Sequence, residues 1–202
     1  LQTRALDADV LIPLMTPITR TIMEKSPARL IHQWGVGLEG VDIDYASQRG
    51  ISVCNVPGDV TANADSTAEH AIFLMLALAR KISEFRKCLE NASWGSPTGK
   101  ALFQSTALIV GLGRVGRSLA SKLKALGMRV VAITRNGVAL QPEAHGVDVI
   151  AAMSDLYNYA RQADFVISTT SLNEQTRGLF NSRLFNSMQE SAFVVNVSRG
   201  PV

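Results

Sequence analysis

Residues 107–135, ALIVGLGRVGRSLASKLKALGMRVVAITR, decide the fold. Apolar runs at residues 107–110 and 130–133 predict two buried parallel strands. Between them the apolar residues recur with helical spacing, and Gly127 stands where a glycine commonly ends a helix. A strand, a glycine turn, a helix and a second strand within about thirty residues form the dinucleotide-binding unit of a Rossmann fold.

Three glycines, Gly111, Gly113 and Gly116, stand between this strand and this helix with the spacing G-x-G-x-x-G. The first is expected to permit a tight turn, the second to let the backbone approach a pyrophosphate, and the third to let helix and strand pack closely. The pyrophosphate would bind the N–H groups of the first helical turn, which begins with Arg114 and Val115. The alternative, a glycine-rich turn that binds nothing, is weakened by the strands and the helix around the motif.

The composition of the 202 residues is that of an ordinary α/β protein, with 47% hydrophobic and 18% charged residues. The net charge of +3 comes from scattered basic residues rather than a clustered stripe, so we expect no nucleic acid as a partner. The longest apolar run, residues 71–79, is too short to cross a bilayer, so we expect no membrane association. Cys54 and Cys88 have no metal-ligand spacing and favour a reducing, cytoplasmic setting. The terminal residues, Leu1 and Val202, suggest a chain that is cut at both ends.

The first part of the chain predicts a small parallel sheet of its own. A loop with three glycines, residues 35–40, follows the second strand, and successive N–H groups in such a loop can hold a carboxylate. A simple connection between strand and helix is an equally good interpretation on local grounds. The expected elements are strands at residues 9–14, 30–31 and 51–53 and helices at residues 18–25 and 43–48.

Residues 63–80 predict a long helix that joins the two α/β parts. Ser66 or Thr67 can cap this helix, with Glu69 completing a capping box. The sequence HAIFLMLALAR is apolar on nearly all sides, so we expect most faces of the helix to be buried. Residues 92–99 have the composition of a loop.

The remaining strands are each expected to end near polar residues. Thr169, Thr170 and Ser171 follow one strand, and Ser198 and Arg199 follow the last. Because ligands of open α/β sheets bind outside the carboxyl ends of the strands, the hydroxyl groups after residue 168 are expected to line a cofactor crevice. Ordinary hydroxyl turns are the alternative. The strands are predicted at residues 147–150, 165–167 and 193–197, and an amphipathic segment at residues 153–160.

Six segments match one protein family in order and spacing. They are GVGLEGVD (residues 35–42), the N-x-x-x-x-A-E run (63–69), GLGRVG (111–116), ADFVIS (163–168), SLNEQT (171–176) and NVSRG (196–200). Together they cover almost the whole chain, which thereby resembles the D-isomer-specific 2-hydroxyacid dehydrogenases. This family includes phosphoglycerate, glyoxylate/hydroxypyruvate and formate dehydrogenases.

The resemblance implies two α/β domains of flavodoxin or Rossmann type with parallel sheets, of which the C-terminal one is doubly wound and incomplete. Residues 1–72 would be the N-terminal part of the substrate-binding domain, and residues 73–202 the NAD(P)-binding domain. The implied reaction is hydride transfer between a nicotinamide cofactor and C2 of a small 2-hydroxy or 2-oxo acid. The family also implies a homodimer formed through the nucleotide domain.

The resemblance assigns roles to individual residues. Val36 and Gly37 would offer backbone N–H groups to the substrate carboxylate. Arg199 matches the family's active-site arginine, whose planar charged fork suits the carboxylate and carbonyl oxygens of the substrate. Further cofactor contacts are expected at Thr169, Thr170, Ser171, Thr176, Val197 and Ser198.

A histidine that acts as general acid/base, with a glutamate beside it, completes the family's site, and both follow the arginine at some distance. The three histidines of this sequence, His32, His70 and His145, stand elsewhere. The 202 residues alone are therefore expected to bind cofactor weakly and to turn over no substrate. Thr169 and Ser171 also depart from the H-x-P turn that many members have there.

The end of the second strand of the glycine unit predicts the choice of nicotinamide cofactor. An acidic residue there would bind the 2′-hydroxyl of the adenosine ribose and repel a 2′-phosphate. Thr134 removes that repulsion and Arg135 adds a cation, so NADP is expected to be favoured over NAD. The alternative is that Arg135 is only a solvated surface residue.

Two other functions stay open. The same fold serves as a nucleotide-sensing co-repressor in this superfamily, and the site residues above do not separate that role from catalysis. The second alternative is another NAD-binding enzyme with a similar glycine turn, such as an adenosylhomocysteinase-like protein. Residues 35–42 and 196–200 argue against this interpretation. The identity of the 2-hydroxy acid does not follow from the sequence.

Overall fold

The computed structural model describes residues 7–14, 16–57, 61–135, 142 and 146–202. Contacts divide the chain into two compact units, Leu1–Ala62 and Asn63–Val202. The boundary expected from the family resemblance, after residue 72, falls inside the first helix of the second unit. Each unit is described by itself below.

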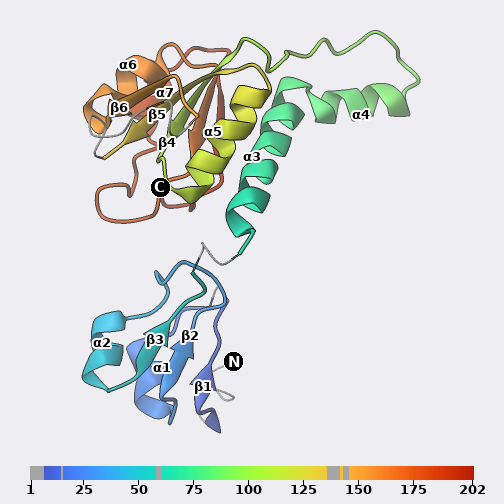
Figure 1. Ribbon diagram of the computed structural model, residues 1–202. Coiled ribbons are helices and arrows are strands. Elements are labelled where there is room, and N and C mark those ends of the chain that lie inside the picture. The colour runs from blue at the N-terminus through green and yellow to red at the C-terminus, as the bar shows by residue number, and fades with distance from the viewer. Residues whose placement is uncertain (1–6, 15, 58–60, 136–141, 143–145) are drawn as a thin grey trace. The chain divides into compact units, whose positions relative to one another are not determined.

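The first unit has a three-stranded parallel sheet in the order β1-β2-β3, as predicted (Figure 1). Its helix α2 has the predicted bounds, because the carboxylate of Asp42 caps it by accepting a 3.0 Å hydrogen bond from the N–H of Tyr45. The first strand is shorter than predicted, since Pro13 has no N–H for a sheet hydrogen bond. The elements are β1 (Val10–Leu11), α1 (Arg20–Lys25), β2 (Leu30–His32), α2 (Ile43–Gln48) and β3 (Ser52–Cys54).

The second unit has a five-stranded parallel sheet in the order β6-β5-β4-β7-β8. The chain runs outward from β4 through β5 to β6, and then returns to the other side of β4 with β7 and β8. This reversal defines a doubly wound sheet, and its switch point lies between β4 and β7. The strands, close to their predicted positions, are β4 (Thr106–Val110), β5 (Arg129–Thr134), β6 (Val149–Ala152), β7 (Phe165–Ser168) and β8 (Phe193–Asn196).

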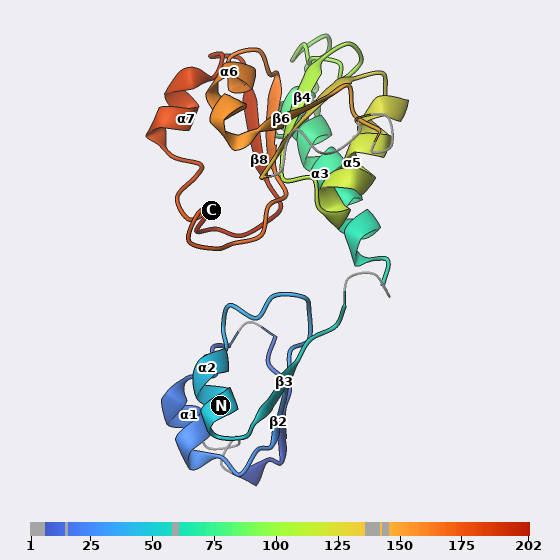
Figure 2. The same cartoon turned by 60° about the vertical axis from the view of Figure 1, so that its left-hand side comes forward.

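Helices cover both faces of this sheet (Figure 2). Alternate residues of β4 show how the two layers form, since Ala107 and Ile109 pack under α3 (Asn63–Ala79) and α5 (Arg114–Ala125). Leu108 and Val110 belong to the opposite layer, which contains α6 (Leu156–Ala160) and α7 (Ser182–Ser187). A short 3₁₀ turn, η3 (Met153–Asp155), leads into α6. The apolar runs in the sequence are continuous because both faces of the strands are buried.

Helix α5 ends at the predicted glycine. Gly127 has φ +74°, and its N–H donates a 2.9 Å hydrogen bond to the carbonyl of Lys124. The N–H of Met128 reaches back to the carbonyl of Leu123 at 3.1 Å, which completes the usual helix-ending motif. A Cβ at Gly127 would also lie 2.5 Å from the exposed ring of Phe103, which would have to move, and the left-handed φ itself disfavours a side chain there.

Helix α3 corrects two predictions. It begins at Asn63, so Ser66 and Thr67 lie inside the helix rather than at its cap, and the hydroxyl of Thr67 donates to the carbonyl of Asn63 at 2.7 Å. The expectation that most of its faces are buried is wrong. Small side chains and Met75 form the one buried stripe, while Phe73 is 61% exposed. The buried residues are Ala68, Ala71, Met75 and Ala79.

Helix α4 (Ile82–Glu90) was not predicted and buries none of its residues. It extends away from the rest of the second unit, together with the loop that follows it (Figure 1). Helix α7 was also not predicted; it is only six residues long, and the side chain of Asn181 caps it by accepting hydrogen bonds from two N–H groups. In the described part of the chain, no helix has the length and apolar character needed to span a membrane.

Candidate active site

The turn after β4 has the conformation that its first and third glycines were expected to permit. Gly111 has φ +105°, and a Cβ there would lie 2.8 Å from Cα of Thr170. A Cβ at Gly116 would lie 2.1 Å from the carbonyl oxygen of Gly111, so α5 packs against the turn at a distance that only glycine allows.

Gly113 differs from the other two glycines because the space beside it is open. Its backbone is extended, with φ −74°, and a Cβ there would meet no atom within 4 Å. Gly113 is the N-cap residue of α5 and provides no side-chain cap. The first turn of α5, at the positive end of the helix dipole, contains no acidic residue that would repel an anion. These features fit the pyrophosphate of a dinucleotide.

The carboxyl end of β7 packs directly on this turn. The hydroxyl of Thr169 donates a 2.6 Å hydrogen bond to the carbonyl of Gly111, and the backbone of Thr170 closes over the same glycine. Because β4 and β7 flank the switch point of the sheet, both loops border the crevice where ligands of such sheets bind. The structure thus brings Thr169 and Thr170 to the glycine turn.

The loop from Ser171 to Thr176 is held by its own hydrogen bonds. Thr176 is buried, and its hydroxyl donates to the carbonyl of Ser171 at 2.7 Å and accepts from the N–H of Asn173 at 2.8 Å. The Asn173 side chain accepts hydrogen bonds from the N–H groups of Gln175 and Thr176. The side chain of Thr176 thus shapes the loop through hydrogen bonds to its backbone.

A second network shapes the loop that carries Arg199. The Asn196 side chain accepts hydrogen bonds from both the N–H and the hydroxyl of Ser198, and it donates one of 2.9 Å to the carbonyl of Arg199. The hydroxyls of Ser198 and the fully buried Ser168 lie 2.6 Å apart. Val197 continues from β8, and its N–H donates to the carbonyl of Ser168. The hydrogen-bonding roles of Asn196 and Ser168 were not predicted, although both residues belong to quoted segments, NVSRG and ADFVIS.

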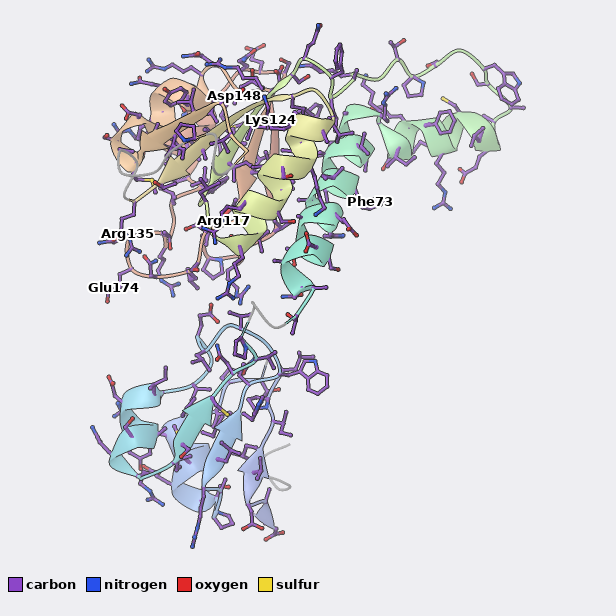
Figure 3. All side chains as sticks on the ribbon, viewed as in Figure 1. Phe73, Arg117, Lys124, Arg135, Asp148 and Glu174 are labelled. Carbon is purple, nitrogen blue, oxygen red and sulfur yellow. The ribbon has the colours of Figure 1, made fainter. Side chains whose placement is uncertain are left out.

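The carboxyl end of β5 provides a hydroxyl that has no partner in the described part of the chain. Thr134 is 9% exposed, and its Oγ1 makes no hydrogen bond with any described residue. Burial of an unpaired hydroxyl is costly, so such a group indicates a missing partner. Arg135 follows it on the surface (Figure 3). An orphaned donor and a cation at this position fit the adenosine ribose of a dinucleotide and its substituents.

The glycine loop of the first unit is fastened at several points. The side chain of Asn55 donates a 2.6 Å hydrogen bond to the carbonyl of Val36, and the N–H of Val56 donates to the carbonyl of Gly35. In contrast, the N–H groups of Val36 and Gly37 make no hydrogen bond with a described residue. Two adjacent donors on a fixed loop can bind an anion such as a carboxylate.

Residues 72–202 match the family model described as D-isomer specific 2-hydroxyacid dehydrogenase, NAD binding domain. The chain belongs to this family. Its second unit is thus the family's domain for a nicotinamide cofactor, and it contains the glycine turn, Thr134, Thr169 and Arg199.

Individual dehydrogenases match over nearly the whole chain. A glyoxylate reductase of Thermococcus litoralis is 31% identical and covers 97% of this chain, and a D-3-phosphoglycerate dehydrogenase of Methanocaldococcus jannaschii is 31% identical and covers 96%. The chain spans 60% and 37% of these two relatives, respectively. A crystal structure of a Thermus thermophilus protein superposes with a TM-score of 0.85 and 29% identity, over 99% of this chain and 63% of that one.

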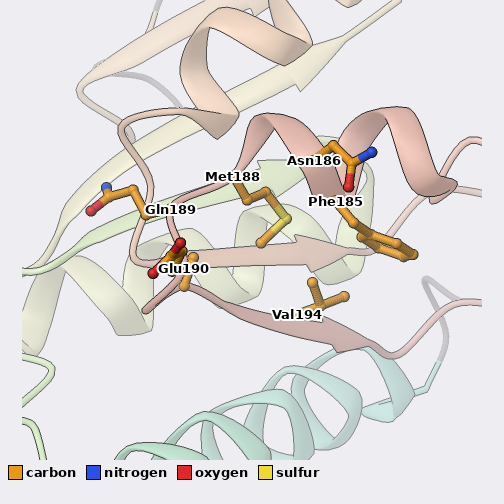
Figure 4. Close-up of a pocket in the computed structure, with 7 residues that line it drawn as sticks. Phe185, Asn186, Met188, Gln189, Glu190 and Val194 are labelled. Carbon is orange, nitrogen blue, oxygen red and sulfur yellow. The ribbon is translucent and has the colours of Figure 1, made fainter.

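The described histidines have structural partners. His32 lies 3.2 Å from the carbonyl of Gln33 through its Nδ1, and His70 stacks on Phe73 with ring centroids 6.0 Å apart. His145 lies outside the described residues. A surface hollow at the end of α7 and along β8 is a separate feature (Figure 4). It contains none of the predicted site residues and is lined by Phe185, Asn186, Met188, Gln189, Glu190, Ala192 and Val194.

Proposed function

We propose that this chain carries the cofactor site and the substrate-carboxylate loop of an NAD(P)-dependent D-2-hydroxyacid dehydrogenase. The glycine turn is the observation that carries the proposal, because Gly111 and Gly116 close it tightly while the space beside Gly113 stays open. A glycine turn with only a structural role has no need for that open space. The bound nicotinamide would supply or accept the hydride at C2 of a 2-hydroxy or 2-oxo acid.

The chain's own residues would bind and orient the acid. The N–H groups of Val36 and Gly37 hold the carboxylate, and the loop keeps its shape through the Asn55 hydrogen bond to Val36. Arg199 orients the carboxylate and the C2 carbonyl and polarises that carbonyl, since its charged guanidinium can bind two oxygens at once. Asn196 holds the backbone carbonyl of Arg199 in place.

A reductase assay tests the proposal. We expect the active enzyme to reduce glyoxylate or hydroxypyruvate with NADPH, the substrates that the names of several relatives indicate. An enzyme that reduces no 2-oxo acid while it binds cofactor normally would instead support a nucleotide-sensing protein. For the 202 residues alone we expect cofactor binding without turnover, because neither His32 nor His70 is placed as an acid/base group in the family's pattern.

Thr134 and Arg135 support a preference for NADP over NAD. The Thr134 hydroxyl is a buried donor without an acceptor among the described residues, and a ribose or its 2′-phosphate would provide one. Thr134 stands where a carboxylate would repel a phosphate, and Arg135 adds a positive charge.

We also propose that the second unit pairs with a second copy of itself. The outer face of α3 and the whole of α4 expose large apolar side chains that a monomer would leave in water. A two-fold pair of such faces is the commonest way for identical chains to bury them. The exposed residues are Phe73, Leu76, Leu78, Ile82, Phe85 and Leu89.

A cytoplasmic location completes the proposal. Cys54 and Cys88 are both free thiols in the structure, which is the usual state of cysteines in a reducing compartment. Cell fractionation against cytoplasmic and membrane markers would test the location.

A further inference from the structure

The carboxyl end of β7 holds two consecutive hydroxyl side chains that bind different neighbours. β7 lies between β4 and β8 in the sheet. Thr169 donates its hydrogen bond to Gly111, on the β4 side, and Ser168 shares one with Ser198, on the β8 side. This strand end therefore contacts both the glycine turn and the arginine loop.

The hydrogen bond from Thr169 fixes the orientation of one peptide group in the glycine turn. It holds the carbonyl of Gly111, and in a trans peptide the following N–H, that of Leu112, points in the opposite direction. That N–H makes no hydrogen bond with a described residue. It is therefore aimed away from Thr169 and is available to a ligand at the turn.

The surroundings of Thr169 leave its side chain little freedom. Its Oγ1 lies 3.0 Å from the position that a Cβ on Gly116 would occupy, and 3.4 Å from the carbonyl oxygen of Val110. The hydroxyl thus sits between the end of β4, the glycine turn and the first turn of α5. A side chain wedged there determines the geometry of the turn even without touching a ligand.

We propose that Thr169 is a positioning residue for the pyrophosphate site, acting through Gly111 and the N–H of Leu112, and not a contact for the nicotinamide half of the cofactor. This inference rests on the proposed function and deepens it. It predicts that the Thr169 hydroxyl strengthens the binding of any ligand that carries a diphosphate, whether or not a nicotinamide is attached.

Dissociation constants for NADPH and ADP, measured by NMR titration, test the inference. ADP carries the diphosphate but no nicotinamide. Thr169→Val keeps the size of the side chain and removes the hydroxyl, so we expect it to weaken both ligands by the same factor, about threefold to tenfold for one hydrogen bond. Thr169→Ser restores the hydroxyl and should bind both ligands within about twofold of the wild type.

Ser187→Ala provides the matched control, because it removes a hydroxyl that donates a 2.6 Å hydrogen bond to the carbonyl of Leu184 in α7. We expect it to leave both dissociation constants unchanged. Weaker NADPH binding by Thr169→Val with unchanged ADP binding would indicate a nicotinamide contact and overturn the inference. Unchanged binding of both ligands, or failure of Thr169→Ser to restore it, would overturn it as well. A wild-type chain that binds neither ligand would contradict the proposed function itself.

Discussion

We propose that two residues at the end of β5 decide which nicotinamide cofactor is bound. Thr134 is buried and its hydroxyl has no partner among the described residues, whereas Arg135 is exposed to solvent. The two therefore contribute differently, because a buried hydroxyl positions the ribose and an exposed cation attracts a phosphate. Only the second contribution distinguishes NADP from NAD.

Replacing the cation tests this assignment. We expect Arg135→Ala to weaken NADPH binding about tenfold, the low end for a charge-assisted hydrogen bond on an exposed surface, and to change NADH binding by less than about twofold. Arg129→Ala, an exposed arginine at the opposite end of β5, is the control and should affect neither cofactor. Equal losses for NADPH and NADH in Arg135→Ala would refute the preference for NADP.

Gly111 and Gly116 were predictable because each has an environment in the glycine turn that only glycine fits. The positive φ of Gly111 and the close packing at Gly116 follow from the G-x-G-x-x-G spacing once the motif is flanked by a strand and a helix. The hydrogen bond between Ser168 and Ser198 was not predictable. It depends on the register between β7 and β8, and single-chain periodicity does not give register.

Among the elements, the strands were the most predictable part of the fold, since both their faces are apolar. Helix α4 was missed because it buries no residue and so contributes nothing to a core. The burial of α3 was overestimated because its exposed faces carry large apolar side chains. An all-round apolar helix predicts a buried helix, but here only a stripe of small residues faces α5 and the sheet. Sequence does not separate a core face from a face that awaits a partner.

Charged contacts hold α5 to its neighbours. At its start and middle, Ser118 and Lys122 donate hydrogen bonds of 2.5 and 2.6 Å to the carboxylate of Asp65 in α3. Near its end, Lys124 bonds Asp148 at 2.7 Å (Figure 3), and the other oxygen of that carboxylate accepts from the N–H of Val130. These contacts fix the helix that begins at the glycine turn.

Acid should weaken these contacts. Burial alone raises the pKa of Asp148, but the hydrogen bonds from Lys124 and Val130 outweigh it and leave the pKa below its ordinary value. Because the pKa of Asp148 is lower in the folded than in the unfolded state, its ionised carboxylate stabilises the folded protein at any pH above its unfolded-state pKa of about 4. This stabilisation is lost as the pH falls through the folded-state pKa of Asp148.

We therefore expect the free energy of unfolding to fall below about pH 4, measured by urea denaturation at several pH values. In Lys124→Met the fall should be smaller, because Asp148 has lost its charged partner. Lys87→Met, which removes an exposed lysine of α4, should retain the wild-type pH profile. A Lys124→Met profile that parallels the wild type would contradict the role of this ion pair.

At the scale of the whole molecule, the exposed apolar faces of α3 and α4 favour a dimer. Phe85 lies on the apolar side of α4 and is 45% exposed. We expect Phe85→Ser to convert the dimer to a monomer in light scattering, or to weaken it at least about tenfold, as for a buried aromatic anchor of an interface. Lys87→Ser, an exposed polar position of the same helix, should remain dimeric. A wild-type chain that is monomeric at high concentration would rule out this interface.

The central claim is that the second unit binds a nicotinamide dinucleotide at the glycine turn, and Gly113 allows the most direct test. A Cβ there would touch no protein atom, and its φ of −74° suits any residue, so Gly113→Ala should fold like the wild type while its methyl group fills the space for the pyrophosphate. Gly35→Ala adds a methyl group to an equally open position in the first unit and is the control.

The decisive measurement is an NMR titration of these three proteins with NADPH. We predict that the wild type and Gly35→Ala show chemical-shift changes at the amides of residues 111–117 and at Thr134, and that Gly113→Ala retains the thermal stability of the wild type but loses at least about tenfold in affinity. Wild-type binding by Gly113→Ala, or shift changes confined to other parts of the chain, would contradict the claim.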